Sequence, residues 1–151
     1  MKREPIALYR ENNKRWLEAK AQEPGVRHLP LGIHYKVLRS GNPEARSPLW
    51  KSMVTIHYTE STIDGKTTDT SRGRDPYTMR LTDLNEGLFI ALQYMHVGDH
   101  WALYVPYERG YGYAPILGIR GFSTLVYEVE LLGVKETSED RVPQCYSKAS
   151  I

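Results

Sequence analysis

The sequence predicts an α+β protein in which one antiparallel β-sheet wraps around one short α-helix, with an additional helix at the N-terminus. Five segments alternate apolar and polar residues with a period of two, which is typical of strands that have one buried face. Between them, residues 84–95 repeat apolar side chains at helical spacing. A sheet with one apolar face needs a cover, and this helix is the element that can supply it.

The N-terminal helix is expected over residues 4–22. Pro5 suits a first turn, where its missing N–H is harmless, and Pro24-Gly25 stops the helix. The strands that follow are expected within residues 32–38, 53–59, 77–81, 101–107 and 123–132. In the second strand Val54, Ile56 and Tyr58 share one face, as an inward-facing row does.

Length and composition narrow the class of protein. A chain of 151 residues favours one domain, here residues 31–135, between an N-terminal helical segment, 1–30, and a polar C-terminal tail, 136–151. The single cysteine, Cys145, fits a reducing compartment. The net charge of +2 gives no argument for a nucleic-acid partner, and no apolar run could span a bilayer. No apolar signal-peptide core follows Met1, so we expect a cytoplasmic protein with no membrane partner.

Tyrosine is the residue type that points to a site. The familiar nucleophile, metal-protease and phosphate-loop motifs do not occur, and the five histidines lack metal-ligand spacing, so no metal or cofactor is expected. The chain has 11 tyrosines, each an apolar ring with a polar tip. Tyr58, Tyr77, Tyr111 and Tyr127 lie on strand faces or in the apolar loop 108–122. They predict a shallow aromatic cleft, with filling of the core as the alternative.

The order of short motifs over residues 53–135 resembles the FKBP-type peptidyl-prolyl isomerases. The motifs are HYT, DGK, DTSR, VGD, LYVP, YG and STLV. The segment before them is similar to the pre-domain segment of the macrophage-infectivity-potentiator subgroup. The resemblance implies a twisted antiparallel sheet around one helix, an apolar pocket, isomerisation of X-Pro bonds in client proteins and, in many members, binding of rapamycin-type macrolides.

The resemblance also implies the site residues. Tyr58 matches the tyrosine of an HYTG-like motif. Asp69 follows the DGK turn at the pocket rim and is expected to face Arg72 and Arg74. Tyr111, of the YG motif, matches a tyrosine whose hydroxyl bonds a ligand carbonyl. Tyr58, Asp69 and Tyr111 are therefore the expected catalytic residues. The expected substrate-binding residues are Tyr77, Leu84, Asn85, Leu88, Ile119 and Tyr127.

Several positions depart from the family pattern. Leu88 replaces a pocket-floor tryptophan, and Thr68 replaces a phenylalanine. A buried aromatic covers about 150–250 Å² at about 25 cal/mol per Å², so these replacements weaken binding by several kcal/mol. Arg120-Gly121 stands where the family has Pro-Pro, which is expected to loosen the loop and to place a charge near the rim.

Three functions follow from these positions. The first is an isomerase whose activity is weak. The second is a non-catalytic FKBP-like module that binds a partner protein. The third is a chaperone-like dimer that uses the N-terminal segment, although that segment is short enough for a monomer as well as a weak dimer. Macrolide binding is expected to be weak in each case.

Overall fold

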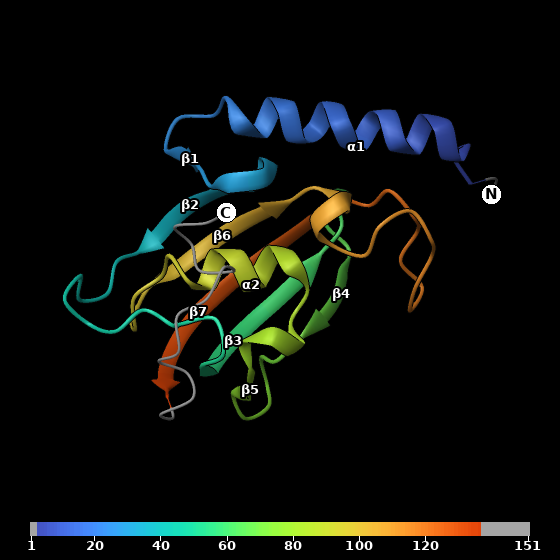
Figure 1. Ribbon diagram of the computed structural model, residues 1–151. Helices are drawn as coiled ribbons and strands as arrows, with labels where there is room; N and C mark the ends of the chain where they lie inside the picture. The colour runs from blue at the N-terminus through green and yellow to red at the C-terminus, as the bar shows by residue number, and fades with distance from the viewer. Residues whose placement is uncertain (1–2, 137–151) are drawn as a thin grey trace.

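The computed structural model describes residues 3–136 and confirms the α+β class (Figure 1). Cys145 and nearly all of the expected C-terminal tail lie outside the described residues. The elements are α1 (Ile6–Ala21), β1 (Val26–His28), η1 (Pro30–Gly32), β2 (His34–Arg39), β3 (Met53–Ser61), β4 (Thr67–Thr70), β5 (Tyr77–Arg80), η2 (Leu81–Asp83), α2 (Glu86–Leu92), β6 (His100–Val105), η3 (Tyr107–Arg109) and β7 (Leu125–Lys135).

The strands form one antiparallel sheet in the order β1-β2-β6-β7-β3-β4. The short strand β5 also pairs with β3, through residues 53–56, while β4 pairs with residues 59–61. All five strands expected from alternation are present. The sequence reading missed β1 and β4, because strands of three and four residues are too short to show a clear period of two.

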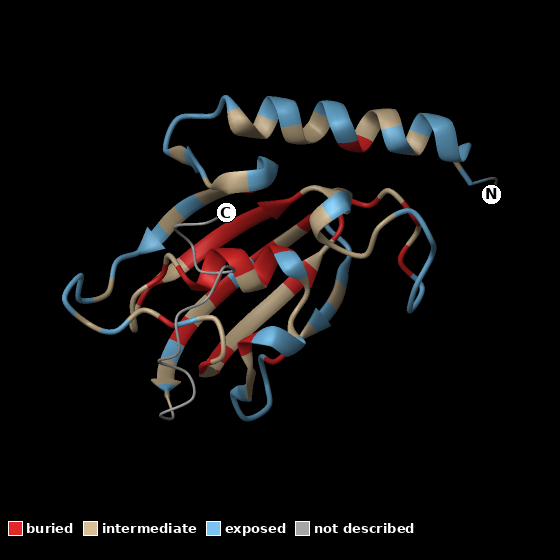
Figure 2. Ribbon diagram, viewed as in Figure 1, coloured by how far each residue is buried: buried red, intermediate tan, exposed pale blue. Residues whose placement is uncertain are grey.

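The core lies between α2 and the sheet, where the buried residues of β3, β6 and β7 gather (Figure 2). The expected helix is present but shorter, since it runs from Glu86 to Leu92. It begins after Asn85, which caps the first turn: the side-chain Oδ1 accepts a hydrogen bond from Leu88 N at 3.0 Å. Gly87 lets α2 approach β6 closely. A Cβ at this position would lie 2.5 Å from Cγ1 of Val105, so a larger residue would push the helix away.

The helix α1 lies along one edge of the domain rather than on the core (Figure 1). Its only buried residue is the polar Asn13. Toward its C-terminal end, the Trp16 ring meets the Tyr104 ring of β6 edge-on at 5.9 Å. Toward its N-terminal end, α1 contacts the loop that precedes β7, as Tyr9 does through Ser123. The helix is therefore held at two places by specific contacts and not by a continuous apolar stripe.

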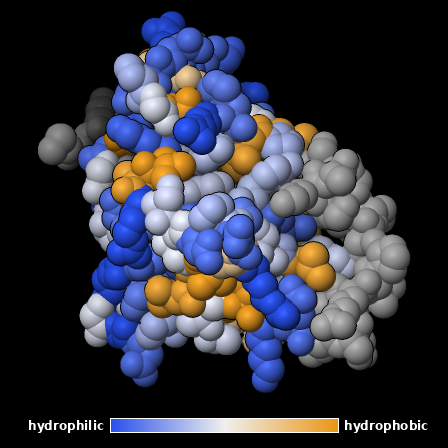
Figure 3. All heavy atoms as spheres, turned by 90° about the vertical axis from the view of Figure 1, so that its left-hand side faces the viewer, coloured by the Kyte–Doolittle hydropathy of each residue, from blue (hydrophilic) through white to orange (hydrophobic). Residues whose placement is uncertain are grey.

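The face turned to the viewer in Figure 3 is mostly hydrophilic, with small separate apolar patches. Within residues 3–136, no helix is both long enough and apolar enough to cross a membrane. Exposed large apolar side chains include Leu38 and Leu132, which are 44% and 38% exposed. Isolated residues of this kind are normal on a protein surface.

Candidate functional site

The nine residues predicted for the site come together at one end of the core, although they lie on six different segments. Leu88, Ile119 and Tyr127 belong to the core, and Tyr58, Leu84 and Tyr111 pack against it. Asp69 and Tyr77 belong to the cluster because both contact Tyr58, Asp69 by a hydrogen bond and Tyr77 through its ring. Asn85 belongs to it through its hydrogen bond to Tyr127. The chemistry of the cluster differs from the apolar pocket that the resemblance implies.

Glu60 lies at the centre of this cluster, and the sequence reading missed it. Its side chain is buried, with 3% of the residue exposed. Oε2 accepts hydrogen bonds from the hydroxyls of Tyr111, at 2.7 Å, and of Tyr127, at 2.5 Å. Oε1 accepts one from the Thr68 hydroxyl at 2.7 Å. All three partners donate, which is the arrangement that satisfies a carboxylate removed from water. We call Glu60 and its three partners the Glu60 network.

The alternation of β3 explains why Glu60 points inward. Val54, Ile56, Tyr58 and Glu60 occupy every second position, so all four side chains leave the same face of the strand. The sequence reading ended this strand at Thr59, whereas the structure extends it to Ser61. A charged residue in phase with an apolar row was the signal that could have revealed the network.

Asn85 connects the Glu60 network to the start of α2. Its Nδ2 donates to the Tyr127 hydroxyl at 2.6 Å, while its Oδ1 caps the helix through Leu88 N. The Tyr127 hydroxyl thus accepts from Asn85 and donates to Glu60. Asn85 stands where the family pattern has isoleucine, and its amide adds a further polar contact in a region that isoleucine would keep apolar.

The network tyrosines hold their protons strongly. Burial, followed by the hydrogen bond to Glu60, raises the pKa of Tyr111 to about 12. Burial and the nearby charge of Glu60 raise the pKa of Tyr127 well above its usual range. Both phenols are therefore neutral donors near pH 7. Their hydroxyl hydrogens point to Glu60 and are not available to another acceptor.

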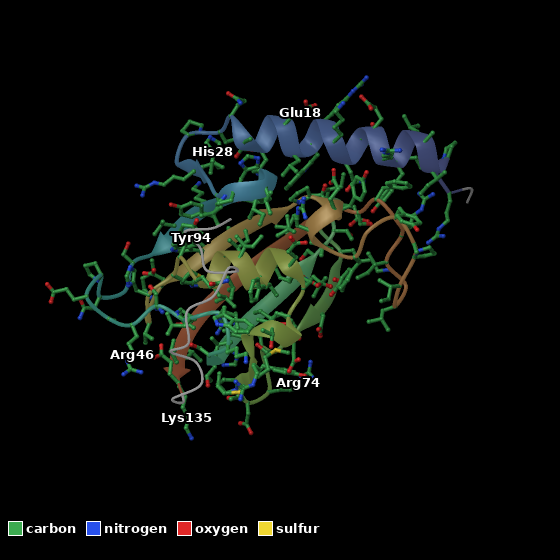
Figure 4. All side chains as sticks on the ribbon, viewed as in Figure 1. Glu18, His28, Arg46, Arg74, Tyr94 and Lys135 are labelled. Atoms are coloured by element: carbon green, nitrogen blue, oxygen red, sulfur yellow. The ribbon has the colours of Figure 1, made fainter. Side chains whose placement is uncertain are left out.

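Tyr58 and Asp69 form a second pair at the rim. The Tyr58 hydroxyl donates to Oδ2 of Asp69 at 2.5 Å, and burial is the main cause that raises the Tyr58 pKa. Arg74, labelled in Figure 4, has its guanidinium 3.8 Å from Asp69 Oδ1. The expectation that Arg72 also faces Asp69 is wrong, because Arg72 pairs with Glu130 at 3.2 Å. Tyr77 is 48% exposed and meets the Tyr58 ring edge-on.

Leu88 and Ile119 form the apolar part of the site, and each is 4% exposed. A cleft of about 290 Å³ borders Ile119 but not Leu88. Its lining includes Thr68 and Ile119, together with Tyr9 of α1 and Arg120. A larger groove between α1 and η3 contains none of the predicted site residues. The cleft that Thr68 lines thus adjoins the Glu60 network.

The loop over the site, residues 110–124, is called the flap below. The expectation that Gly121 loosens it stays a prediction. A Cβ at Gly121 would lie 1.9 Å from the Tyr113 carbonyl oxygen, so glycine allows the two limbs of the flap to cross closely. Arg120 lines the cleft beside Ile119, as expected of a charge near the rim, and its guanidinium carbon lies 4.5 Å from the centroid of the Tyr9 ring.

The sequence of this chain is similar to proteins of one known family. The family model for the FKBP-type peptidyl-prolyl cis-trans isomerase matches residues 44–132, and the chain belongs to this family. The chain is 34% identical to the macrophage infectivity potentiator of Trypanosoma cruzi over 131 residues, which are 85% of this chain and 66% of that protein. It is 36% identical to FkpA of Escherichia coli K12 over 139 residues, 91% of this chain and 51% of FkpA.

Solved structures agree with the fold. A peptidyl-prolyl cis-trans isomerase from Pseudomonas syringae superposes with a TM-score of 0.81 at 30% identity, over 90% of this chain and all of that one. FkpA of Escherichia coli superposes with a TM-score of 0.79 at 35% identity, over 85% of this chain and 60% of FkpA. The expected FKBP-like fold and the likeness to the macrophage-infectivity-potentiator subgroup are confirmed. The chain spans between about half and two thirds of the length of the two curated relatives above.

Proposed function

We propose that this chain catalyses cis/trans isomerisation of X-Pro bonds in client proteins, at a low rate. The observation that carries the proposal is that Tyr58, Tyr111 and Ile119 lie in or against the same core, with Asp69 bonded to the Tyr58 hydroxyl. The family resemblance assigns these residues to the site. Membership of the family and the isomerase relatives support the same activity.

The reaction requires little covalent chemistry from the protein. The barrier to rotation about the peptide bond is about 18–20 kcal/mol, because rotation breaks the amide resonance. The twisted amide is less dipolar than the planar one, so a water-poor surface favours it over the ground state. Ile119, which lines the cleft and packs in the same core cluster as Leu88, supplies part of such a surface. The rim residues Tyr58 and Asp69 supply polar contacts that orient the chain around the rotating bond.

Glu60 is the reason that we propose a low rate. The resemblance gives the Tyr111 hydroxyl the role of holding a substrate carbonyl, but this hydroxyl already donates a hydrogen bond to Glu60 Oε2, with 2.7 Å between the two oxygens. A neutral carbonyl is a weaker acceptor than a carboxylate, and hydrogen bonds to charged groups contribute about 1.5–3 kcal/mol. A substrate must displace Glu60 or bind without this contact, which lowers kcat/KM by about tenfold or more.

A non-catalytic binding module is the second candidate function, and the Glu60 network favours it directly. A site whose donors are all satisfied internally would hold an apolar segment of a partner without activating its X-Pro bond. The same network argues for weak binding of rapamycin-type macrolides. The chaperone role, the choice between monomer and weak dimer, and the cytoplasmic location remain predictions from the sequence.

A peptide isomerisation assay separates the two candidates. We expect the wild-type chain to accelerate the isomerisation of an X-Pro peptide modestly, and Asp69→Ala to remove most of that acceleration. Arg15→Ala is the matched control, since Arg15 is an exposed residue of α1 that pairs with Glu11 on the same helix. No acceleration by the wild type, together with measurable binding of the same peptide, would contradict catalysis and establish the binding module.

A further inference from the structure

The flap reaches the site through two of its residues, Tyr111 and Ile119. Tyr111 belongs to the Glu60 network, and Ile119 belongs to the core beside Leu88. The chain between Ile119 and β7 is therefore the segment that sets where the apolar wall of the site lies. This segment runs beneath the N-terminal half of α1 (Figure 1), although the two are more than 100 residues apart in the sequence.

Asn13 is the strongest link between α1 and the flap. Its Oδ1 accepts a hydrogen bond from the Thr124 backbone N–H at 2.8 Å, and its Nδ2 donates to the Tyr9 carbonyl at 2.8 Å. Asn13 is 2% exposed and Thr124 is 3% exposed, so the contact is closed to water. Without Asn13, the buried amide of Thr124 would lose this partner, which is a costly loss inside a protein.

Tyr9 forms a second link one turn earlier. Its hydroxyl lies 2.7 Å from Ser123 Oγ, and Ser123 Oγ in turn donates to the Arg120 carbonyl at 2.7 Å. The Arg120 guanidinium stacks over the ring of the same tyrosine. Tyr9 therefore contacts the flap with both its hydroxyl and its ring, directly after Ile119 in the chain.

Arg10 forms the third link, at Phe122. The Arg10 guanidinium carbon lies 4.6 Å from the centroid of the Phe122 ring, and that ring meets Tyr107 edge-on at 4.9 Å. Phe122 has a left-handed backbone, with φ of 66°, which is uncommon for a bulky residue. Such a conformation persists where its surroundings hold it, and here α1 and η3 both do so.

We propose that α1 contributes to the site by positioning the flap. Tyr9 and Asn13 of this helix are positioning residues that hold the flap over the X-Pro binding surface. Tyr9, Arg10 and Asn13 of α1 make four contacts with residues 120–124, and none is a general apolar contact with the core. In this chain the helix supplies the stiffness that Pro-Pro would otherwise give at Arg120-Gly121. The effect on catalysis rests on the proposed function. The contacts of Tyr9, Arg10 and Asn13 with residues 120–124, called the clamp below, do not rest on it.

Hydrogen exchange tests the clamp without reference to activity. In Asn13→Ala we expect the amides of residues 119–124 to exchange at least about tenfold faster than in the wild type, which corresponds to about 1.4 kcal/mol. The amides of β6 and β7 should keep their wild-type rates. Tyr9→Phe keeps the ring under Arg120 and loses only the hydroxyl contact, so its effect should lie between those of the wild type and Tyr9→Ala. Unchanged exchange in the flap of Asn13→Ala and Tyr9→Ala would overturn the proposal.

Peptide kinetics test the link to the site. If the flap is correctly placed in only a fraction of molecules, the apparent affinity for peptide falls by that fraction, so KM should rise about tenfold while kcat stays within about twofold. Trp16→Ala is the matched control, because it removes the contact of α1 with Tyr104 and leaves the flap contacts in place. An equal rise of KM in Trp16→Ala would show a general loss of stability and overturn the proposal.

The two proposals fail in different ways. A wild-type chain without isomerase activity, but with faster flap exchange in Asn13→Ala, would contradict the proposed function and leave the clamp standing. In that case the dissociation constant of the same X-Pro peptide replaces KM as the second measurement, with the same expected tenfold rise.

Discussion

The core beneath α2 and the Glu60 network at its end are built on the same pair of strands. In the core, Ile56 of β3 lies opposite Leu131 of β7, and both are fully buried. Four pairs further along the same register, Glu60 lies opposite Tyr127, and both are again buried. The backbone pairing is continuous over these pairs, while the inward-facing chemistry changes from apolar to polar. The comparison shows that a sheet can keep its fold and alter its site within four register positions.

The largest effect of a substitution is expected in the apolar core. Leu103 of β6 is completely buried, and Leu103→Ala removes apolar burial and leaves a cavity. We expect the free energy of unfolding to fall by about 2–5 kcal/mol, measured by urea denaturation. Leu117→Ala is the control, because Leu117 is 87% exposed and should change stability by no more than about 0.5 kcal/mol. Similar losses in the two variants would contradict the placement of the core.

A smaller but distinct effect is expected in the Glu60 network. Tyr127→Phe removes one donor to Glu60 and one acceptor for Asn85, so two polar groups lose a partner. The expected loss is about 1–3 kcal/mol of unfolding free energy. Tyr77→Phe is the control, since Tyr77 is 48% exposed and should change stability by about 0.5 kcal/mol or less. If the two variants unfold at the same urea concentration, the network contributes nothing to stability.

Alkaline pH should lower the stability that the Glu60 network contributes, because the network contains titratable tyrosines and the aliphatic side chains of the core do not titrate. The pKa of Tyr111 is raised to about 12 in the folded protein, from an ordinary value of 10. A phenol with a raised folded pKa stabilises the fold fully below its unfolded pKa, and that contribution is lost as pH rises from about 10 through about 12. We expect a fall in unfolding free energy over this interval. The fall should be smaller in Tyr111→Phe, and an identical pH profile in the variant would contradict the assignment.

The two regions also differ in how far the sequence predicts them. The alternation around Val54 and Ile56 predicts the strands and the core, because a repeated pattern over five or more residues outweighs a single exception. The same alternation holds the signal for Glu60, but the predicted strand ends at Thr59, the residue before Glu60. Motif resemblance placed Tyr58, Asp69 and Tyr111 together, but not the hydrogen bonds that occupy their hydroxyls.

The partner that a side chain meets on a distant segment does not follow from the local sequence pattern. Asn13 looks like an ordinary polar residue of an exposed helix until its contact with Thr124 is seen. Arg72 and Arg74 are two positions apart, yet the structure directs them to Glu130 and Asp69 respectively. Local periodicity predicts the element and the face of a residue, and only the packed fold determines its partner.

The central claim is that Glu60 occupies the hydroxyls that a substrate carbonyl would use, and Glu60→Ala tests it most directly. Removal of the carboxylate frees the hydroxyls of Tyr111 and Tyr127, so kcat/KM for an X-Pro peptide should rise by about tenfold, which corresponds to about 1.4 kcal/mol. Glu60→Gln is the intermediate case, because its amide oxygen still accepts from the hydroxyls but is a weaker acceptor than a carboxylate, so kcat/KM should lie between the values of the wild type and Glu60→Ala. A kcat/KM for Glu60→Ala at or below that of the wild type, in a folded variant, would contradict the account.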